Sequence, residues 1–327
     1  MGNDISRNSS TFDGGGIRYQ DIAKINLWNN TISENTARDG GGISFSELET
    51  EVFVNNMIWG NTATRNGGAM SFTPDFWYTY LDGFNNTFAH NTAACGGGIH
   101  TFGRVNIVLK NMIFWDNIAP DGPEIYMGNS PEPAKLKIRY SDVKGGVSSV
   151  YVGTGISFEW GAENIDKDPL FVDEAGHDFH LIFGSPCVDA GDLNAVIKNF
   201  DFENDPRKVD GKCDIGADAF HTHFYCTGDF TPGGVVTGTF IGFPHPWHPW
   251  ETVLFIGAGI KDPPVSTLWG DFYLDAPWTA VEMGLLPFNG VIQVTQQIPG
   301  IVPTPQDVPM QALIMNELSN LFVLEVR

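Results

Sequence analysis

The stretch Ile32–Ile43, ISENTARDGGGI, contains both motifs that decide the fold, and the chain repeats them. Its first half is an I/F-x-x-N box, and its second half is a glycine cluster followed by an aliphatic residue. The boxes are Ile5–Asn8, Ile32–Asn35, Ile58–Asn61, Phe88–Asn91 and Phe114–Asn117. Successive box asparagines are 27, 26, 30 and 26 residues apart, and a nearly fixed period in this range predicts a repeat architecture.

The glycine clusters recur with the boxes. They are Gly14-Gly15-Gly16, Gly40-Gly41-Gly42, Asn66-Gly67-Gly68, Gly96-Gly97-Gly98 and the eroded Gly122-Pro123-Glu124. The residues that follow them are Ile17, Ile43, Ala69, Ile99 and Ile125. Because glycine accepts positive φ, such a column marks a corner that a side chain would obstruct. We therefore expect three stacked corner residues, Gly41, Gly67 and Gly97.

The segments between a cluster and the next box alternate in polarity with a period of two, as in Val105–Leu109 (VNIVL). This period is typical of strands. Three strands of about 5 residues with their turns fill one repeat, which is one coil of a parallel β-helix. A helical-hairpin repeat would be longer and richer in Ala, Leu, Glu and Lys. The sequence therefore predicts an all-β solenoid of about 26 residues per coil.

The box residues then have a structural role. Asparagine tolerates the left-handed region, and its amides can form a ladder between coils about 4.8 Å apart. The expected ladder residues are Asn35, Asn61, Asn91 and Asn117. The expected inward files contain Ile32, Ile58, Phe88 and Phe114. We interpret the repeat as a scaffold and look for function where the repeat is broken.

Length and charge exclude several classes of protein. The 327 residues leave room for two or three domains. Asp and Glu number 39 against 18 Lys and Arg, a net charge of −21, which disfavours nucleic acid and anionic membranes as partners. Aromatic residues make up 13%, so the chain is no disordered acidic tail. No apolar run is long enough for a transmembrane helix.

The four cysteines, Cys95, Cys187, Cys213 and Cys226, do not have the C-x-x-C spacing of a zinc site. We predict a disulfide between Cys187 and Cys213, which is compatible with an oxidising compartment. The first box follows Met1 within four residues, with no signal peptide or polar cap before it, whereas solenoids need capped ends. We therefore expect a fragment whose upstream coils and export signal are not included.

The motifs after residue 139 carry a specific resemblance. They are YSDVKGG (Tyr140–Gly146), NIDKDPLFVD (Asn164–Asp173), DFHL (Asp178–Leu181), GSPCVDAGD (Gly184–Asp192), DPR (Asp205–Arg207) and DIGA (Asp214–Ala217). This succession resembles the C-terminal end of secreted bacterial right-handed parallel β-helix proteins related to the pectin-lyase-like superfamily. The earlier boxes are similar to the FxxN and GGA-I repeats of polymorphic outer-membrane proteins. The two resemblances cover roughly residues 1–220 and imply a right-handed β-helix at the cell surface or outside the cell, without specifying an activity.

Three domains are predicted along the chain. Residues 1–130 form the regular coils, and residues 131–222 form the final coils and the C-terminal cap region. From residue 223 onward, short apolar runs are separated by Pro and Gly turns, as in Val253–Ile256 and Gly290–Val294. This pattern is typical of an antiparallel β-sandwich, so residues 223–327 are predicted to form an appended C-terminal domain.

Two aromatic segments are candidate contact sites. The interval between Asn61 and Asn91 is longer than the others and contains the insertion Thr73–Tyr80. Insertions in solenoids lie in loops on one face. A second segment, Pro244–Trp250, is rich in Pro, His and Trp. Exposed rings can stack on sugars or anchor a partner; alternatively, they pack against a coil or the sandwich. The candidate carbohydrate or partner contacts are Phe76, Trp77, Tyr78, Tyr80, Trp247 and Trp250.

Catalytic signatures are missing from the sequence. Pectin-hydrolase relatives carry NTD, DD, GHG and RIK motifs, whereas this chain has Lys137-Ile138-Arg139 and Gly176-His177-Asp178. A glycoside hydrolase needs carboxylates about 5–9 Å apart, and a lyase needs a base and a cation. Basic residues in the coils are scattered and form no file. We assign no catalytic residue.

Metal ligands are a further possibility from the sequence. Loop aspartates supply the oxygen ligands that Ca²⁺ prefers, although they also cap Asx turns. The calcium candidates are Asp166, Asp168, Asp173 and Asp205. His221-x-His223 with Cys226, and His245-x-x-His248, offer zinc ligands without a matching fourth.

The features together predict a non-catalytic scaffold or adhesin of the cell surface or the extracellular space that contacts carbohydrate, with a polysaccharide or a cell-surface glycan as its partner. One alternative is a polysaccharide lyase or glycoside hydrolase of the pectin-lyase-like fold. The other is a calcium-dependent adhesion module.

Overall fold

The computed structural model describes residues 2–73, 79–182, 184–203, 206–208 and 211–220, and the backbone of nine strands between His223 and Leu318. Side chains of residues 21–23 and 47–51 are outside this description. The described part is built from strands and two single-turn 3₁₀ helices, η1 (Gly146–Ser149) and η2 (Leu193–Ala195). In this part, no helix has the length and hydrophobicity needed to cross a membrane.

The chain divides into two compact units. Unit 1 comprises Met1–Leu181 with Ser185–Phe220, and unit 2 comprises Ile182–Gly184 with His221–Arg327. The described strands of unit 2 pair antiparallel in three groups, β21-β22-β27, β26-β23-β28-β29 and β24-β25. Their bounds are β21 (His223–Gly228), β22 (Val235–Ile241), β23 (Glu251–Gly257), β24 (Ile260–Thr267), β25 (Gly270–Leu274), β26 (Trp278–Leu285), β27 (Val291–Gln297), β28 (Met310–Ile314) and β29 (Glu317–Leu318).

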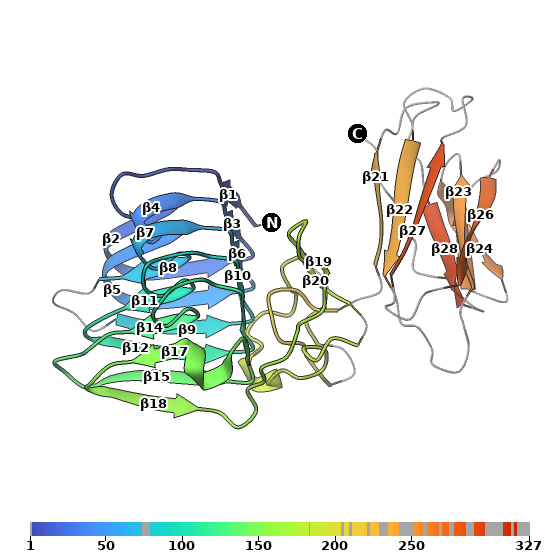
Figure 1. Cartoon of the computed structure of the whole chain (residues 1–327). Coiled ribbons are helices and arrows are strands. Elements are labelled where there is room, and N and C mark those ends of the chain that lie inside the picture. Colours follow the sequence, from blue (N-terminus) through green and yellow to red (C-terminus); the bar gives the residue numbers. More distant parts are fainter. Residues whose placement is uncertain are drawn as a thin grey trace. The chain divides into compact units, whose positions relative to one another are not determined.

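Unit 1 is a parallel β-solenoid. One short strand from each of six coils forms a sheet in the order β1-β3-β6-β10-β13-β16, which we call the short sheet. Its strands are β1 (Asp4–Ser6), β3 (Thr31–Ser33), β6 (Met57–Trp59), β10 (Thr87–Ala89), β13 (Ile113–Trp115) and β16 (Asp142–Val143). All pairs are parallel and advance by one coil, so the repeat predicted from the boxes is confirmed (Figure 1).

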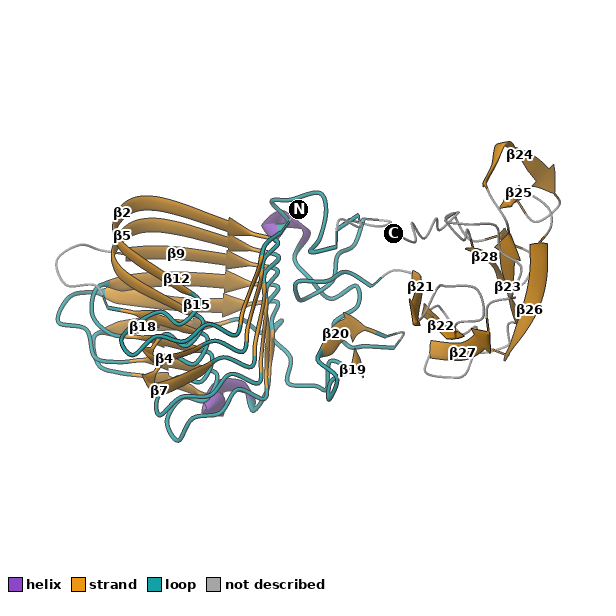
Figure 2. Cartoon of the chain, turned by 90° about the horizontal axis from the view of Figure 1, so that it is seen from above, coloured by secondary structure: helices purple, strands orange, loops and turns teal. Residues whose placement is uncertain are grey.

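A second, longer sheet follows the glycine corners, in the order β17-β14-β11-β8-β5-β9-β12-β15-β18, with β2 also paired to β5. Figure 2 shows β2, β5, β9, β12 and β15 side by side as one layer. The bounds are β2 (Ile17–Trp28), β5 (Ile43–Val54), β8 (Met70–Phe72), β9 (Thr79–Phe84), β11 (Ile99–Thr101), β12 (Val105–Lys110), β14 (Ile125–Met127), β15 (Ala134–Arg139), β17 (Val150–Val152) and β18 (Ile156–Trp160). A smaller pair joins β4 (Thr36–Asp39) to β7 (Thr62–Asn66).

The core consists of files of apolar side chains stacked from coil to coil. The box residues Ile32, Ile58, Phe88 and Phe114 are at most 2% exposed. The rings of Phe88 and Phe114 stack at 4.9 Å. Removing these side chains from water stabilises the fold by about 1.5–3 kcal/mol each. The inward files predicted from the boxes are therefore present.

The glycine corners require glycine for two reasons. Gly40 and Gly67 both have φ of +64°, where a side chain is strained. At the next position, a Cβ on Gly41 would lie 2.5 Å from the carbonyl oxygen of Gly68, and one on Gly97 would lie 2.6 Å from the nitrogen of Ile118.

The third glycine cluster differs by one residue from the sequence prediction. Ile43 pairs with Met70 rather than with Ala69, and Met70 pairs with Ile99. Asn66 pairs with Asp39 in the preceding strand. The cluster therefore runs from Gly67 to Ala69, because the small Ala69 fits the third place of the corner.

The box asparagines form a buried ladder. Each Nδ2 donates to the Oδ1 of the next asparagine: Asn35 to Asn61 at 3.0 Å, Asn61 to Asn91 at 2.9 Å and Asn91 to Asn117 at 2.8 Å. The same Oδ1 atoms accept the backbone N–H of the preceding asparagine. The ladder thus satisfies polar groups that would be costly to bury unpaired.

A second ladder, which the sequence analysis missed, borders the other side of the short sheet. Asn30 donates to Asn56, and Asn56 donates to Asn86, both at 2.9 Å. Each is preceded by an asparagine at positive φ, as at Asn29 and Asn55. The available signal was the Asn-Asn pair that recurs with the period of the boxes. The short sheet is therefore held between two amide ladders.

Glu124 ends the first ladder. The following coil brings no asparagine, and Asn117 Nδ2 instead donates to Glu124 Oε2 at 2.5 Å. Glu124 is only 2% exposed, and this burial raises the pKa of its carboxyl to about 8. The eroded cluster Gly122-Pro123-Glu124 thus provides a polar end to the ladder.

The substitution Asn61→Ala should destabilise the solenoid by roughly 3 kcal/mol or more, because it leaves several buried donors and acceptors unpaired. The exposed neighbour Thr64→Ala provides the matched control and should change stability by less than about 0.5 kcal/mol. Urea unfolding monitored by circular dichroism measures both. Equal midpoints for the two variants would contradict a stabilising ladder.

Glu124 should make stability depend on pH. Its folded pKa of about 8 lies above the ordinary 4.5, so the folded state retains a proton that the unfolded state loses as pH rises from 4.5 to 8. Relative to wild type, Glu124→Gln should gain up to about 1.4 kcal/mol per pH unit across this window. Unfolding free energies at pH 5, 6, 7 and 8 measure the gain, with Asp142→Asn as a second buried acid whose raised pKa is about 7. A constant difference for Glu124→Gln would exclude this role.

Candidate functional site

A later segment contacts the outer face of the short sheet, which carries the side chains of Trp59 and Thr87. We call the described residues of 161–181 and 185–220, all in unit 1, the cover. Asn29 Nδ2 donates to the carbonyl of Asp201 at 2.7 Å, and Asn55 Nδ2 donates to that of Phe200 at 2.8 Å. The asparagines at positive φ beside the second ladder therefore hold the cover in place, and this contact creates the site.

A hairpin of the cover lies beside the short sheet (Figure 1). It joins β19 (Phe171–Asp173) to β20 (Asp178–Leu181). The ring of His177 in its turn stacks on Trp59 at 4.3 Å and 22°. Phe179 lies 6.0 Å from Trp59 and 5.7 Å from His90, measured between ring centroids. Two rings from neighbouring coils, Trp59 and His90, and two from the hairpin thus form one aromatic cluster.

A pocket of about 320 Å³ opens between the hairpin and the short sheet. Its volume is at the lower end of the range for small-molecule sites. Its wall combines aromatic side chains with a carboxylate, imidazoles and a hydroxyl. The lining residues are Thr31, Met57, Trp59, Gly176, His177, Asp178, Phe179, His180 and Phe202.

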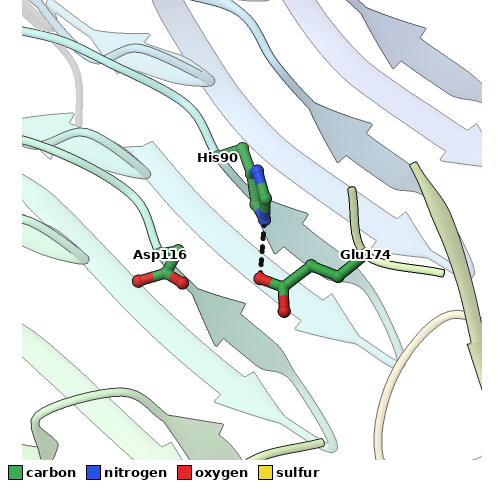
Figure 3. Close-up of side chains that lie close together, drawn as sticks. All are labelled: His90, Asp116 and Glu174. Carbon is green, nitrogen blue, oxygen red and sulfur yellow. Dashed lines mark hydrogen bonds and ion pairs between the residues drawn. The ribbon is translucent and has the colours of Figure 1, made fainter. Parts of the chain in front are cut away.

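His90 of the aromatic cluster also belongs to a polar group with Asp116 and Glu174 (Figure 3). His90 and Asp116 follow neighbouring strands, and Glu174 reaches them from the hairpin turn. His90 Nε2 lies 2.8 Å from Glu174 Oε1, and one ligand atom from each residue lies within 4.8 Å of the other two. Lys144 contacts Asp116 and stands 4.7 Å from the centroid of the Trp115 ring.

The box motif explains how this group is positioned. His90 and Asp116 directly precede ladder asparagines and have φ of 57° and 52°. The same position in earlier coils is occupied by Glu34 and Gly60, at 54° and 64°. The left-handed backbone at this corner allows the side chain to point outward from each coil. The third position of each I/F-x-x-N box, directly before the asparagine, could therefore have identified His90 and Asp116 from the sequence.

A second cluster contains His180. Its Nδ1 contacts Asp178, and its Nε2 lies 2.9 Å from Glu203 Oε2. Burial opposes protonation of His180, but its hydrogen bonds with Asp178 and Glu203 outweigh burial and raise its pKa well above the ordinary value. Asp218 is 3% exposed, and burial raises the pKa of its carboxyl well above the ordinary value.

Asp166, Asp168 and Asp173, the described residues among the predicted calcium ligands, lie in the cover, and each accepts a backbone N–H. Asp168 Oδ1 accepts the N–H of Leu170 at 2.9 Å, and Asp173 Oδ1 accepts that of Gly176 at 3.0 Å. Asp166 Oδ1 accepts the N–H of Gly145. In the described part of the chain, neither three-residue cluster of metal-ligating atoms includes these aspartates. Asp205 lies outside the described residues.

Among the predicted aromatic contacts, Tyr80 lies on β9 and is 51% exposed. Phe76, Trp77, Tyr78, Trp247 and Trp250 lie outside the described residues, as do His221, His245 and His248. His223 and Cys226 belong to β21, whose side chains are not described. The pocket residues come from other parts of the chain. The sequence analysis did not find them, because the hairpin and Trp59 are far apart in sequence and come together only in the fold.

The disulfide predicted between Cys187 and Cys213 is wrong, since both thiols are free. Cys187 Sγ donates to Asp142 Oδ2 at 3.2 Å, and Cys213 Sγ accepts from Asn111 Nδ2 at 3.9 Å. Burial raises the pKa of both thiols, that of Cys213 to about 11. Each sulfur of the cover therefore has its own partner on the solenoid.

No family model matches the sequence, and neither the curated proteins nor the solved structures compared with it yield a match. The assignment of a parallel solenoid of about 26 residues per coil rests on the strand register observed in this structure.

Thiol labelling should distinguish the three described cysteines in protein purified without reductant. Cys187 and Cys213 are buried, so iodoacetamide should alkylate them only after denaturation. The partly exposed Cys95 should react in the native protein, slowly because burial raises its pKa. Peptide mass spectrometry reads each site separately, and a disulfide-linked peptide containing Cys187 and Cys213 would contradict the free thiols.

Proposed function

We propose that this protein is a non-catalytic β-solenoid scaffold that binds neutral carbohydrate in the pocket beside Trp59. The observation that carries the proposal is the pocket wall, which contains the rings of Trp59, His177 and Phe179 together with the polar residues Asp178 and His180. A sugar presents a face of C–H groups and a rim of hydroxyls. Rings suit the first, and carboxylate and imidazole suit the second.

Electrostatics favours neutral over anionic glycans. The chain carries a net charge of −21, and the pocket wall includes the carboxylate of Asp178. Glu203 and Asp218 lie beside His180, which also lines the pocket. A uronate polymer would approach like charges, which costs binding energy.

The scaffold gives this pocket a rigid base. Trp59 belongs to a short strand whose neighbours are fixed by two amide ladders, and rigid elements position a binding site well. The antiparallel strands of unit 2 support the proposal that residues 223–327 form an appended β-sandwich. A solenoid with such a module suits display outside the cell or on its surface, as the motifs resembling secreted β-helix proteins imply.

Glycoside hydrolysis is the second candidate, on one observation. Carboxylate oxygens of Asp116 and Glu174 lie within 4.8 Å of each other, near the roughly 5 Å that separates the two carboxyl groups of retaining enzymes. Each already contacts a basic side chain, Asp116 that of Lys144 and Glu174 that of His90. These partners favour a structural ion pair over a reactive carboxyl pair.

Titration calorimetry with cellohexaose, xylohexaose, mannohexaose and laminarihexaose should show binding of at least one, and polygalacturonate should bind less tightly. Trp59→Ala should weaken the bound oligosaccharide at least tenfold, because an aromatic contact of about 1.4 kcal/mol or more is lost. His177→Asn should act in the same direction, and asparagine accepts the φ of 65° at this position.

Two matched controls locate the site. Trp28→Ala removes a ring that is 42% exposed outside the pocket and should leave affinity unchanged. Tyr80→Ala tests the aromatic insertion, and a loss of binding there with none at Trp59 would overturn the pocket as the site. Reducing-end and unsaturated-uronate assays on the same sugars should show no product; product that disappears in Glu174→Gln would establish the hydrolase instead.

A further inference from the structure

We propose that His180, Glu203 and Asp218 bind a divalent transition-metal ion, with Zn²⁺ as its reference. One ring nitrogen of His180 and one carboxylate oxygen from each acid lie within 4.8 Å of one another. Two atoms that each lie about 2.1 Å from a tetrahedral zinc are about 3.4 Å apart. The 2.9 Å between His180 Nε2 and Glu203 Oε2 is therefore close to the spacing of two ligands.

Asp218 supplies an independent observation. Its carboxylate is 3% exposed, and neither oxygen has a hydrogen-bond partner in the described part of the chain. A buried carboxylate without a partner is costly, so the group needs a cation or a proton. Its position beside an imidazole and a second carboxylate is suited to a metal ligand.

The neighbouring Arg207 attracts the Asp218 carboxylate electrostatically but forms no hydrogen bond with its oxygens in the described part of the chain. Its guanidinium donates to the carbonyl oxygens of Asp218 at 3.1 Å and Ala217 at 2.7 Å, and to Asn55 Oδ1 at 3.3 Å. It also contacts the carbonyl of Gly216. These bonds fix the backbone that carries Asp218 and leave its carboxylate oxygens without a hydrogen bond.

The surroundings of His180 match those of a metal-binding histidine. Such a histidine commonly donates its second ring N–H to a carboxylate, which fixes the ring. Here Nδ1 of His180 contacts Asp178, so Nε2 faces Glu203. Two ligand carboxylates balance a charge of +2, and the partly exposed Glu203 leaves a route for the ion.

The ligand set indicates the class of ion. Imidazole with carboxylates suits zinc and related transition ions, whereas Ca²⁺ prefers six to eight oxygen ligands. Three protein ligands leave a position for water, as in open zinc sites. The ion would join β20 to two later segments of the cover, so its binding should stabilise the folded cover.

The test titrates the full chain, without a histidine tag and after chelator treatment, with Zn²⁺, Mn²⁺ and Ca²⁺ by calorimetry. One Zn²⁺ per chain is expected, bound at least tenfold more tightly than Ca²⁺, with a rise in melting temperature that chelator reverses. Glu203→Gln and Asp218→Asn should each weaken Zn²⁺ at least tenfold. The Glu203 change lies at a partly exposed side chain and keeps the test valid if Asp218→Asn does not fold.

Glu174→Gln and Asp166→Asn are the matched controls. They remove a carboxylate from the cluster at His90 and from a turn of the cover, and they should leave Zn²⁺ affinity unchanged. Absence of Zn²⁺ binding, unchanged affinity in Glu203→Gln, or loss of affinity in Glu174→Gln would each overturn the assignment to His180. Tighter binding of Ca²⁺ than of Zn²⁺ would do the same. Because His180 also lines the pocket, these titrations are carried out without added sugar.

Discussion

The amide hydrogen bond between stacked asparagines is the interaction on which unit 1 depends. Each coil is short and buries only a thin layer of apolar side chains, so neighbouring coils must hold a common register. Asn61 meets this need by donating to Asn91 while accepting from Asn35. Because both sides of the short sheet carry such a ladder, the strand between them has little freedom to shift, and its outward residues keep fixed positions.

This fixed face explains why the chemistry of unit 1 gathers under the cover. The outward side chains of the short sheet include Trp59 and Trp115, and the cover supplies His177 and Phe179 to pack nearby. Covering this face with a polar, acidic segment leaves carboxylates and imidazoles at the margin. Some have nearby partners, as His90 has Glu174, whereas the buried Asp218 oxygens have no hydrogen bond among the residues that the structure describes. The pocket lies where the short sheet meets the cover, and the proposed metal ligands all belong to the cover.

The repeated part of the fold could be predicted because its constraints are local. A glycine at positive φ and an asparagine at a stacked turn are each recognisable from a few residues and a period. The second ladder was visible in pairs such as Asn29-Asn30 but was not used. The site depends on contacts across long separations, such as that between Asn29 and Asp201, 172 residues apart, for which no period exists. The disulfide was mispredicted because the sequence positions of Cys187 and Cys213 do not reveal that Asp142 and Asn111 contact the two sulfurs.

The residue before each ladder asparagine has one further consequence. Arg7, Glu34, Gly60, His90 and Asp116 occupy equivalent corners, at a step of about 4.8 Å per coil. The backbone at these five corners requires only a left-handed conformation. The side chains that form the core and the two amide ladders come from other positions. The side chains at these positions can therefore be substituted one at a time, which changes the charge and the hydrogen-bonding groups along a regularly spaced row. A solenoid of this kind can acquire recognition of an extended, evenly spaced partner without altering what keeps it folded.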